Sequence, residues 1–167
     1  ETFTDNRIKL VCSKENLGFA GGNNEALRHC SYDLIVLLNN DTIVHDEWLG
    51  KLVNADNDDN IVASSLVINE GIPKKYYESN GSVSYLMYNI MNVFPDIEDE
   101  FYPNGCSVIF RQSELGIPFD SDYFFYGEDV YLGLKARFMG MKIKFVKDSV
   151  IDHKGSSTVV ATSFRTF

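Results

Sequence analysis

The sequence predicts an α/β domain in which a mixed, mainly parallel sheet is flanked by helices. Leu34–Leu38 is an uninterrupted apolar run, which is typical of a strand buried on both faces. Ile61–Ile68 is a second strand-like run, and between the two, His45–Val53 carries apolar residues at helical spacing. This alternation of strands and helices indicates parallel strands joined by crossover helices.

Length, composition and charge limit the possible classes of protein. The 167 residues, 44% of them hydrophobic, suffice for one α/β domain with a sizeable core, so we expect residues 1–167 to form a single domain. The net charge of -9 argues against a nucleic-acid-binding surface, which requires a basic field. No apolar run approaches membrane-spanning length. The three cysteines include no CxxC pair, which fits a reducing compartment.

The N-terminal part is predicted to be a strand, a glycine-rich loop and a helix. These elements are Ile8–Cys12, Ser13–Gly22 and Asn23–His29, with Gly22 or Asn23 as the N-cap. Backbone N–H groups in such a loop can face an anion, although a purely structural loop is the alternative. The loop does not read GxGxxG, so a dinucleotide fingerprint is not supported.

The second half is predicted to hold a further set of elements after a stretch of loops and short hairpin strands. In the helix that opens at Glu128, the apolar residues Val130, Leu134 and Phe138 recur at helical spacing, which predicts a buried stripe, and Gly140 ends the helix. The predicted strands and short helix are Asn104–Arg111, Gln112–Leu115, Lys142–Val146 and Val150–His153.

Polar residues follow the buried strand at once, as Asn39, Asn40 and Asp41. In α/β sheets, ligands bind at the carboxyl ends of strands. A carboxylate in that position can hold a divalent cation that also touches a diphosphate. The alternative is that these residues only turn the chain and cap the next helix. We expect Val36, Leu37 and Leu38 to be buried in a central parallel strand, with Asp41 just beyond its end.

Three stretches occur in a fixed order that resembles a known family. They read NLGFAGGNN at 16–24, LNND at 38–41 and FYGED at 125–129, and Asn104-Gly105 and His153 accompany them. Together they resemble the family 2 glycosyltransferases of the GT-A fold, in particular the rhamnosyltransferase-like enzymes of polysaccharide synthesis. The resemblance extends from Ile8 to about Ser156.

The resemblance implies an inverting transfer of a sugar from a nucleotide-diphosphate sugar to the hydroxyl of a glycan or lipid-linked acceptor, with Mg²⁺ or Mn²⁺ as the divalent cation. It implies Asp129 as the general base, with Glu128 beside it, on the same side of the sheet as Asp41. Asp41 and His153 would bind the metal. The implied acceptor-side residues are Asn104, Gly105 and Tyr126. The implied donor-binding residues are Asn16, Gly18, Phe19, Gly21, Asn23, Asn24, Asn39, Asn40 and Asp41.

Single residue types leave other interpretations open. Glu128 and Asp129 could be ordinary acids of a helix start, which the helix dipole favours, and His153 could be a packed or surface histidine. Glu128 and Asp129 are adjacent, so on a helix their side chains point about 100° apart, and only one of them can face the site squarely. The family resemblance and the predicted buried stripe favour Asp129 as that residue.

One feature departs from the family. Its members open with a strand-helix-strand segment that holds the nucleotide base and ribose, and nothing before Ile8 matches it. We therefore expect an N-terminally truncated fragment whose sheet has an exposed edge, which would allow self-association. For the full enzyme we expect a cytoplasmic location at the inner face of the membrane, with peripheral membrane association.

Two other functions are compatible with the sequence. A catalytically inactive nucleotide-sugar or glycan-binding module would keep the same fold. A nucleotidyltransferase that makes sugar nucleotides shares a related sheet, but we would expect a glycine-rich loop followed by a basic residue near its first strand. The sequence contains no such loop.

Overall fold

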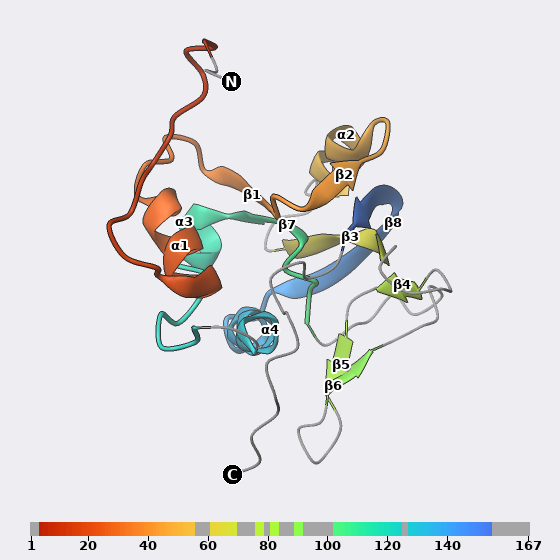
Figure 1. Ribbon diagram of the computed structural model, residues 1–167. Helices are drawn as coiled ribbons and strands as arrows, with labels where there is room; N and C mark the ends of the chain where they lie inside the picture. Colours follow the sequence, from red (N-terminus) through yellow and green to blue (C-terminus); the bar gives the residue numbers. More distant parts are fainter. Residues whose placement is uncertain are drawn as a thin grey trace, which may run out of the picture.

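The computed structural model describes residues 4–55, 61–69, 76–78, 81–83, 89–91, 102–124 and 127–154. Its strands form a larger sheet in the order β1-β7-β3-β8-β2, with β4 beside β3, and a separate β5-β6 pair (Figure 1). The strands are β1 (Leu34–Leu38), β2 (Thr42–Val44), β3 (Ile61–Asn69), β4 (Tyr76–Glu78), β5 (Gly81–Val83), β6 (Asn89–Met91), β7 (Ser107–Arg111) and β8 (Lys142–His153). The helices are α1 (Gly18–Leu27), α2 (Trp48–Asn54), α3 (Gln112–Leu115) and α4 (Glu128–Phe138).

The sheet is mixed, as expected, but its described strands are not mainly parallel. Parallel pairing occurs between β3 and β8, whereas β1–β7, β7–β3, β3–β4 and β2–β8 are antiparallel. The predicted strands Leu34–Leu38 and Ile61–Ile68 do run in the same direction. They are not neighbours, because β7 lies between them and is antiparallel to both.

Helices cover both faces of the sheet (Figure 1). Helix α2 packs on one face through Leu52 and Ala55, against residues of β3 and β7. Helices α1, α3 and α4 pack on the other face, where they form the larger core cluster. The members of that cluster are Ala20, Leu27, Ile35, Leu37, Val62, Val108, Phe110, Leu115, Phe119, Leu132, Ala136, Met141 and Ile143.

Strand β1 is less buried than its sequence predicts. Ile35 and Leu37 are buried, but Val36 is half-buried and 42% of Leu38 is exposed. In the described sheet, β1 stands at the end of the strand order with β7 as its neighbour. Side chains on the α2 face of an end strand lack a flanking strand, so the expectation of a fully buried central strand was wrong for Val36 and Leu38.

The predicted strand Ile8–Cys12 is not a strand in the structure. Its side chains are exposed, with Leu10 at 86%. An extended segment forms a ladder only where a neighbouring strand pairs with its backbone N–H and C=O groups. No described strand pairs with these residues.

Helix α1 begins at Gly18, whereas the sequence predicted a glycine-rich loop as far as Gly22. The Gly18 N–H donates to Asn16 Oδ1 (3.0 Å), and the Phe19 N–H donates to the carbonyl of Phe124 (3.2 Å). These bonds satisfy amide groups that a helix start leaves unpaired. Glycines that weaken a helix are therefore tolerated here because distant contacts support its first turn.

Helix α4 has the predicted ends but buries a different face. Its fully buried residues are Leu132, Gly133 and Ala136, whereas 89% of Phe138 is exposed. The predicted stripe of Val130, Leu134 and Phe138 is therefore wrong. The small Gly133 and Ala136 let this face of the helix lie close to the sheet, and Leu132 fills the core beside them. No helix in the described residues is long and apolar enough to cross a membrane.

Candidate active site

Asp41 and His153 meet at the edge formed by β2 and β8. Thr42 pairs with His153 across these antiparallel strands, and the Lys154 N–H donates to the Asp41 carbonyl (3.0 Å). His153 Nε2 lies 3.3 Å from Asp41 Oδ1, and 14% of the imidazole and 28% of the carboxylate are exposed. Two residues far apart in sequence are thus brought together as the family resemblance implied.

Among the described residues, one ring nitrogen of His153 has no hydrogen-bond partner. Nδ1 is buried and bonds to no group in the described part of the chain. A carboxylate accepts hydrogen bonds but cannot donate them, so a neutral ring facing Asp41 carries its hydrogen on Nε2 and leaves Nδ1 as a bare acceptor. In this tautomer the buried Nδ1 lone pair accepts no hydrogen bond from the described residues.

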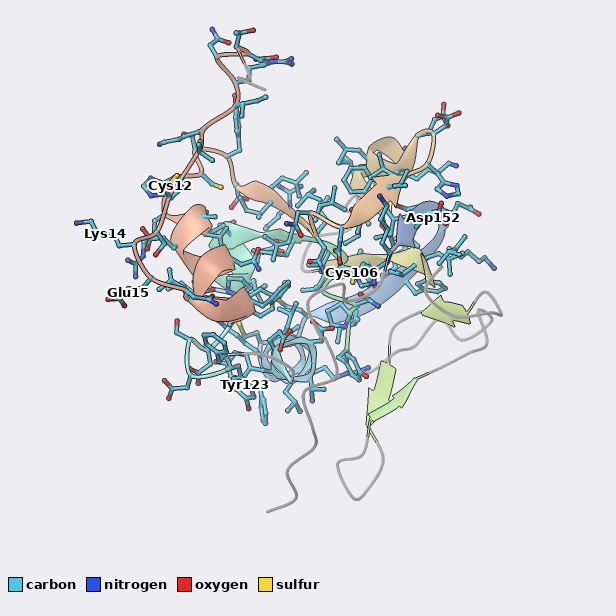
Figure 2. The ribbon with its side chains drawn as sticks, in the orientation of Figure 1. Cys12, Lys14, Glu15, Cys106, Tyr123 and Asp152 are labelled. Carbon is cyan, nitrogen blue, oxygen red and sulfur yellow. The ribbon has the colours of Figure 1, made fainter. Side chains whose placement is uncertain are left out.

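A second His–Asp pair lies on the opposite face at the same end of the sheet, and no sequence pattern indicated it. His45 Nε2 lies 3.0 Å from Asp152 Oδ2, and 44% of His45 is exposed. Adjacent strand residues point to opposite faces, so Asp152 and His153 face away from each other. Figure 2 shows Asp152 where β8 meets β2, away from Cys106 near the middle of the sheet.

The turn after β1 is fixed by contacts with Cys106, a residue that the sequence analysis did not select. The Asn39 N–H donates to the Cys106 carbonyl (2.9 Å), and Asn39 Nδ2 donates to the Cys106 sulfur (3.5 Å). Thr42 Oγ1 donates to the Asn39 carbonyl (2.7 Å). Residues Asn39 to Thr42 form a turn, as the alternative interpretation held, with Asn40 exposed on it, but the turn leads into β2 and does not cap a helix.

Asp129 lies against Gly105. A Cβ atom built on Gly105 would be 2.3 Å from Asp129 Oδ1, closer than any real side chain allows. Asn104 Oδ1 accepts a hydrogen bond from the Cys106 N–H (2.9 Å), which fixes this short segment. Segment 104–106 thus touches Asp129 at Gly105 and Asn39 at Cys106, and links the base implied by the family resemblance to the turn that carries Asp41.

Asp129 is on the inner face of α4, but not for the reason that the predicted stripe gave. Leu132, Gly133 and Ala136 are the buried residues. Side chains three and four positions apart share a helix face, so Asp129 continues this buried row by one turn. Its carboxylate is directed toward the sheet and reaches Gly105.

Glu128 is not a simple solvated acid of the helix start. Its side chain is half-buried, and Oε2 is buried without a hydrogen-bond partner in the described residues. Burial disfavours the charged form and raises the pKa of this carboxyl above its ordinary value of 4.5. Burial of the charged carboxylate therefore lowers the stability of the folded state at neutral pH.

Glu128→Gln is therefore expected to raise the Tm at neutral pH. The pKa of Glu128 is higher in the folded than in the unfolded state, so acidification protonates the folded form first and relieves the cost. The gain in Tm should be fully present well above the folded-state pKa and should shrink as the pH falls toward 4.5. Thermal melts of both proteins across this range test it, with Glu15→Gln at an exposed acid as the control. An equal gain in Tm at every pH would contradict the explanation.

The side-chain amides of Asn23 and Asn24, which the resemblance implied as donor-binding, form hydrogen bonds within the protein. Asn23 Nδ2 donates to the Phe19 carbonyl (2.9 Å). Buried Asn24 donates to the Phe119 carbonyl (2.8 Å) and to Ser121 Oγ (3.2 Å), and its Oδ1 has no partner among the described groups. These bonds tie α1 to the segment that leads to α4.

The remaining donor-site residues lie on or just before the first turns of α1. Asn16 caps the Gly18 N–H, and Phe19 packs edge-on against Phe119 with ring centroids 5.4 Å apart. Gly21 is half-buried within the helix. Tyr126, the remaining acceptor-side residue, lies outside the described residues.

A divalent cation fits the Asp41–His153 pair if the donor supplies the remaining ligands. The described residues contain no group of three or more His, Cys, Asp or Glu side chains that could hold a metal ion. Mg²⁺-type cations commonly use one or two protein ligands and complete their coordination with phosphate and water. The Asp41 carboxylate and His153 Nε2, which lie 3.3 Å apart, would be the two protein ligands of such a cation.

Comparisons with known proteins bear on the family and the fold. The sequence model described as glycosyl transferase family 2 matches residues 1–116. Among solved structures, the crystal structure of GalNAc-T7 with UDP, GalNAc and Mn²⁺ is similar, with a TM-score of 0.70 and 18% identity. The match covers 87% of this chain and 32% of that one, so the chain spans about a third of its length. No curated protein sequence matches the chain. The predicted GT-A fold is confirmed.

Proposed function

Since the chain belongs to glycosyl transferase family 2, we propose that the complete protein transfers a sugar from a nucleotide-diphosphate sugar to an acceptor hydroxyl, with inversion at the anomeric carbon. One observation carries the proposal. Segment 104–106 contacts Asp129 through Gly105 and the turn before Asp41 through Cys106. The candidate base and the candidate diphosphate end of the donor site thus flank one short stretch of backbone.

In the proposed reaction, the acceptor oxygen attacks the anomeric carbon from the face opposite the diphosphate. A carbon–oxygen bond to the acceptor forms, the bond to the diphosphate breaks, and the acceptor proton passes to the carboxylate of Asp129. A positioned carboxylate within hydrogen-bond reach can take that proton. The start of a helix stabilises the anionic form of Asp129 that this step requires.

We assign Asp41 and His153 to the cation. The similar GalNAc-T7 structure was crystallised with UDP and Mn²⁺, and here His153 Nε2 faces the Asp41 carboxylate at 3.3 Å, so that the two side chains could hold one ion. A bound cation would stabilise the negative charge that develops on the leaving diphosphate. Asn39, held by Cys106, keeps the turn before Asp41 in place.

The subgroup of the family and the class of acceptor are proposed from the sequence motifs. The ordered set 16–24, 38–41 and 125–129 supports a rhamnosyltransferase-like enzyme of polysaccharide or glycolipid synthesis, acting on a glycan or lipid-linked acceptor at the inner face of the membrane.

The function is tested by incubating the complete protein with a panel of nucleotide-diphosphate sugars, Mn²⁺ and lipid-linked or glycan acceptors. We expect nucleoside diphosphate release that depends on the acceptor, and an NMR spectrum of the product that shows the inverted anomeric configuration. Saturable donor binding without release would identify a catalytically inactive binding module. A retained anomeric configuration would contradict the single-displacement mechanism.

Asp41→Asn is expected to abolish Mn²⁺-dependent binding of a nucleoside diphosphate to the complete enzyme. The amide keeps the shape of the side chain but removes the charge that faces the cation. Isothermal titration with and without Mn²⁺ measures the effect. Asp152→Asn is a matched control, because Asp152 belongs to the His–Asp pair on the other face at the same end of the sheet. Titration curves for Asp41→Asn that equal those of the unchanged protein would rule out the assignment.

A further inference from the structure

Strand β8 pairs with β3 in two registers that are separated by a bulge. Ile61 to Ser65 pair with Lys142 to Val146, and Leu66 to Asn69 pair with Val150 to His153. Residues 147–149 have no opposite residue on β3. The second half of β8 also pairs with β2, where His153 stands opposite Thr42. The position of His153 beside Asp41 therefore depends on how the bulge is held.

A hydrogen-bonded group of three buried serines and the half-buried Trp48 holds the bulge; we call Trp48, Ser65, Ser107 and Ser149 the serine network. All three serines have no exposed surface. Ser149, at the end of the bulge, donates from Oγ to the Trp48 carbonyl (3.0 Å), and its Oγ lies 2.8 Å from Ser65 Oγ. Ser65 Oγ lies 2.7 Å from Ser107 Oγ, and Trp48 Nε1 donates to both of these hydroxyls (3.0 Å each).

The hydrogen-bond directions in the serine network follow from the supply of hydrogens. Each hydroxyl has one hydrogen to donate. Ser149 gives its hydrogen to the Trp48 carbonyl, so Ser65 donates to Ser149, and Ser107 in turn donates to Ser65. The indole N–H completes a closed path that begins and ends on Trp48. Every polar group in it is satisfied, which is the condition under which a buried network specifies a unique geometry.

The serine network joins the elements that carry the Asp41–His153 pair. Ser149 lies on β8 ahead of His153. Ser107 starts β7 directly after Cys106, whose carbonyl and sulfur hold Asn39 in the turn that leads to Asp41. Ser65 lies on β3 at the register change, and Trp48 begins α2. Both members of the pair are thus anchored to the serine network.

We propose that the serine network is a positioning device which fixes the β8 bulge and thereby holds His153 against Asp41. The proposal rests on the proposed function only in that it takes this pair as the cation site. Loss of one hydroxyl frees residues 147–149 to change their conformation, and the second half of β8 then shifts relative to β2. Because the three serines are fully buried, they act on the cation site through His153.

Ser149→Ala tests the proposal in the complete protein labelled with ¹⁵N at histidine. The His153 ring signals, identified by their absence in His153→Gln, should show the Nε2–H tautomer in the unchanged protein. In Ser149→Ala the preference for that tautomer should be lost. The Kd for Mn²⁺ should rise about 10- to 100-fold, as is usual when support of a metal ligand is removed.

Ser64→Ala is the matched control. Ser64 is the neighbour of Ser65 on β3, is equally buried, and points to the other face of the sheet. Its loss should leave the His153 ring signals unchanged whatever it costs in stability. Where Ser149→Ala does not fold, Trp48→Phe removes the indole donor while keeping an aromatic side chain, and the same loss of tautomer preference is expected.

Two results would overturn the proposal: unchanged His153 ring signals in a folded network variant, or an equal change in Ser64→Ala. The proposed function can fail separately. If the unchanged protein binds no Mn²⁺ but Ser149→Ala still alters the His153 signals, the positioning role stands and the cation assignment is wrong.

Discussion

Asp129→Asn is expected to lower the kcat of sugar transfer by the complete enzyme roughly 10²–10⁴-fold, which is the usual contribution of a positioned acid or base. The substitution keeps the side-chain shape beside Gly105 but removes the carboxylate that would accept the acceptor proton. The Kd for the donor should stay near normal, because Asp41 and its turn are unchanged. Steady-state kinetics at saturating donor, together with donor titration, measure the two quantities separately.

Glu128→Gln is the adjacent comparison, since it also removes one carboxylate from the first turn of α4. Its kcat should fall less than that of Asp129→Asn. Glu128 is half-buried, and it is Asp129 that lies on the row of Leu132, Gly133 and Ala136. If Glu128→Gln proves the more damaging change, or if Asp129→Asn transfers sugar at the full rate, Asp129 is not the base.

Gly18→Ala is expected to destabilise the fold by about 1–3 kcal/mol, the range for a residue held in a sparsely populated backbone conformation. Gly18 has a φ of 67°, and a Cβ there would lie 2.3 Å from the backbone carbonyl oxygen of Phe124. That oxygen accepts the Phe19 N–H, so the added methyl group would separate α1 from the segment before α4. Urea unfolding curves measure the loss.

Gly22→Ala is the matched control in the same helix. A Cβ on Gly22 meets no atom within 4 Å, and its φ is not positive. Alanine at a helix interior position is favoured over glycine by roughly 0.5–1 kcal/mol, so this variant should be more stable than the unchanged protein. A destabilised Gly22→Ala, or a neutral Gly18→Ala, would show that the contact with Phe124 does not support α1.

Elements that depend on local patterns were predictable from the sequence. The short helix Gln112–Leu115 has the predicted bounds, and the strand Ile61–Ile68 differs by one residue. Both are surrounded by clear signals, such as Gly116 after the helix and a continuous apolar run in the strand. The residues within and next to these two elements are sufficient to determine them, and sequence patterns describe those residues.

Elements that depend on distant partners were not predictable in this way. The start of α1 rests on the carbonyl of Phe124, and β2 exists because Thr42–Val44 pairs with the end of β8. The sequence around α1 and β2 does not indicate either of these distant partners. The inner face of α4 was mispredicted because the sheet selects the small Gly133 and Ala136, a choice set by available volume.

The candidate site follows the same division. Motif order singled out His153 and Asp129, since no periodicity links residues so far apart, whereas Asp41 was also indicated by its place directly after a buried strand. The structure places Asp41 beside His153, and Asp129 beside Gly105. The roles of these residues remain predictions. Nothing in the sequence indicated Cys106 or the serine network, because a buried serine in a strand looks like any small residue until its neighbours are known.

Trp48 has a spectroscopic consequence. It is the one tryptophan of the chain, and its indole N–H is shared between Ser65 and Ser107. The fluorescence of an indole depends on the polarity and hydrogen bonding around it, so the emission maximum of this chain reports on the environment at the junction of β3, β7 and β8. Cation or donor binding that moves the second half of β8 can therefore be followed as a change in intrinsic emission, without any attached dye.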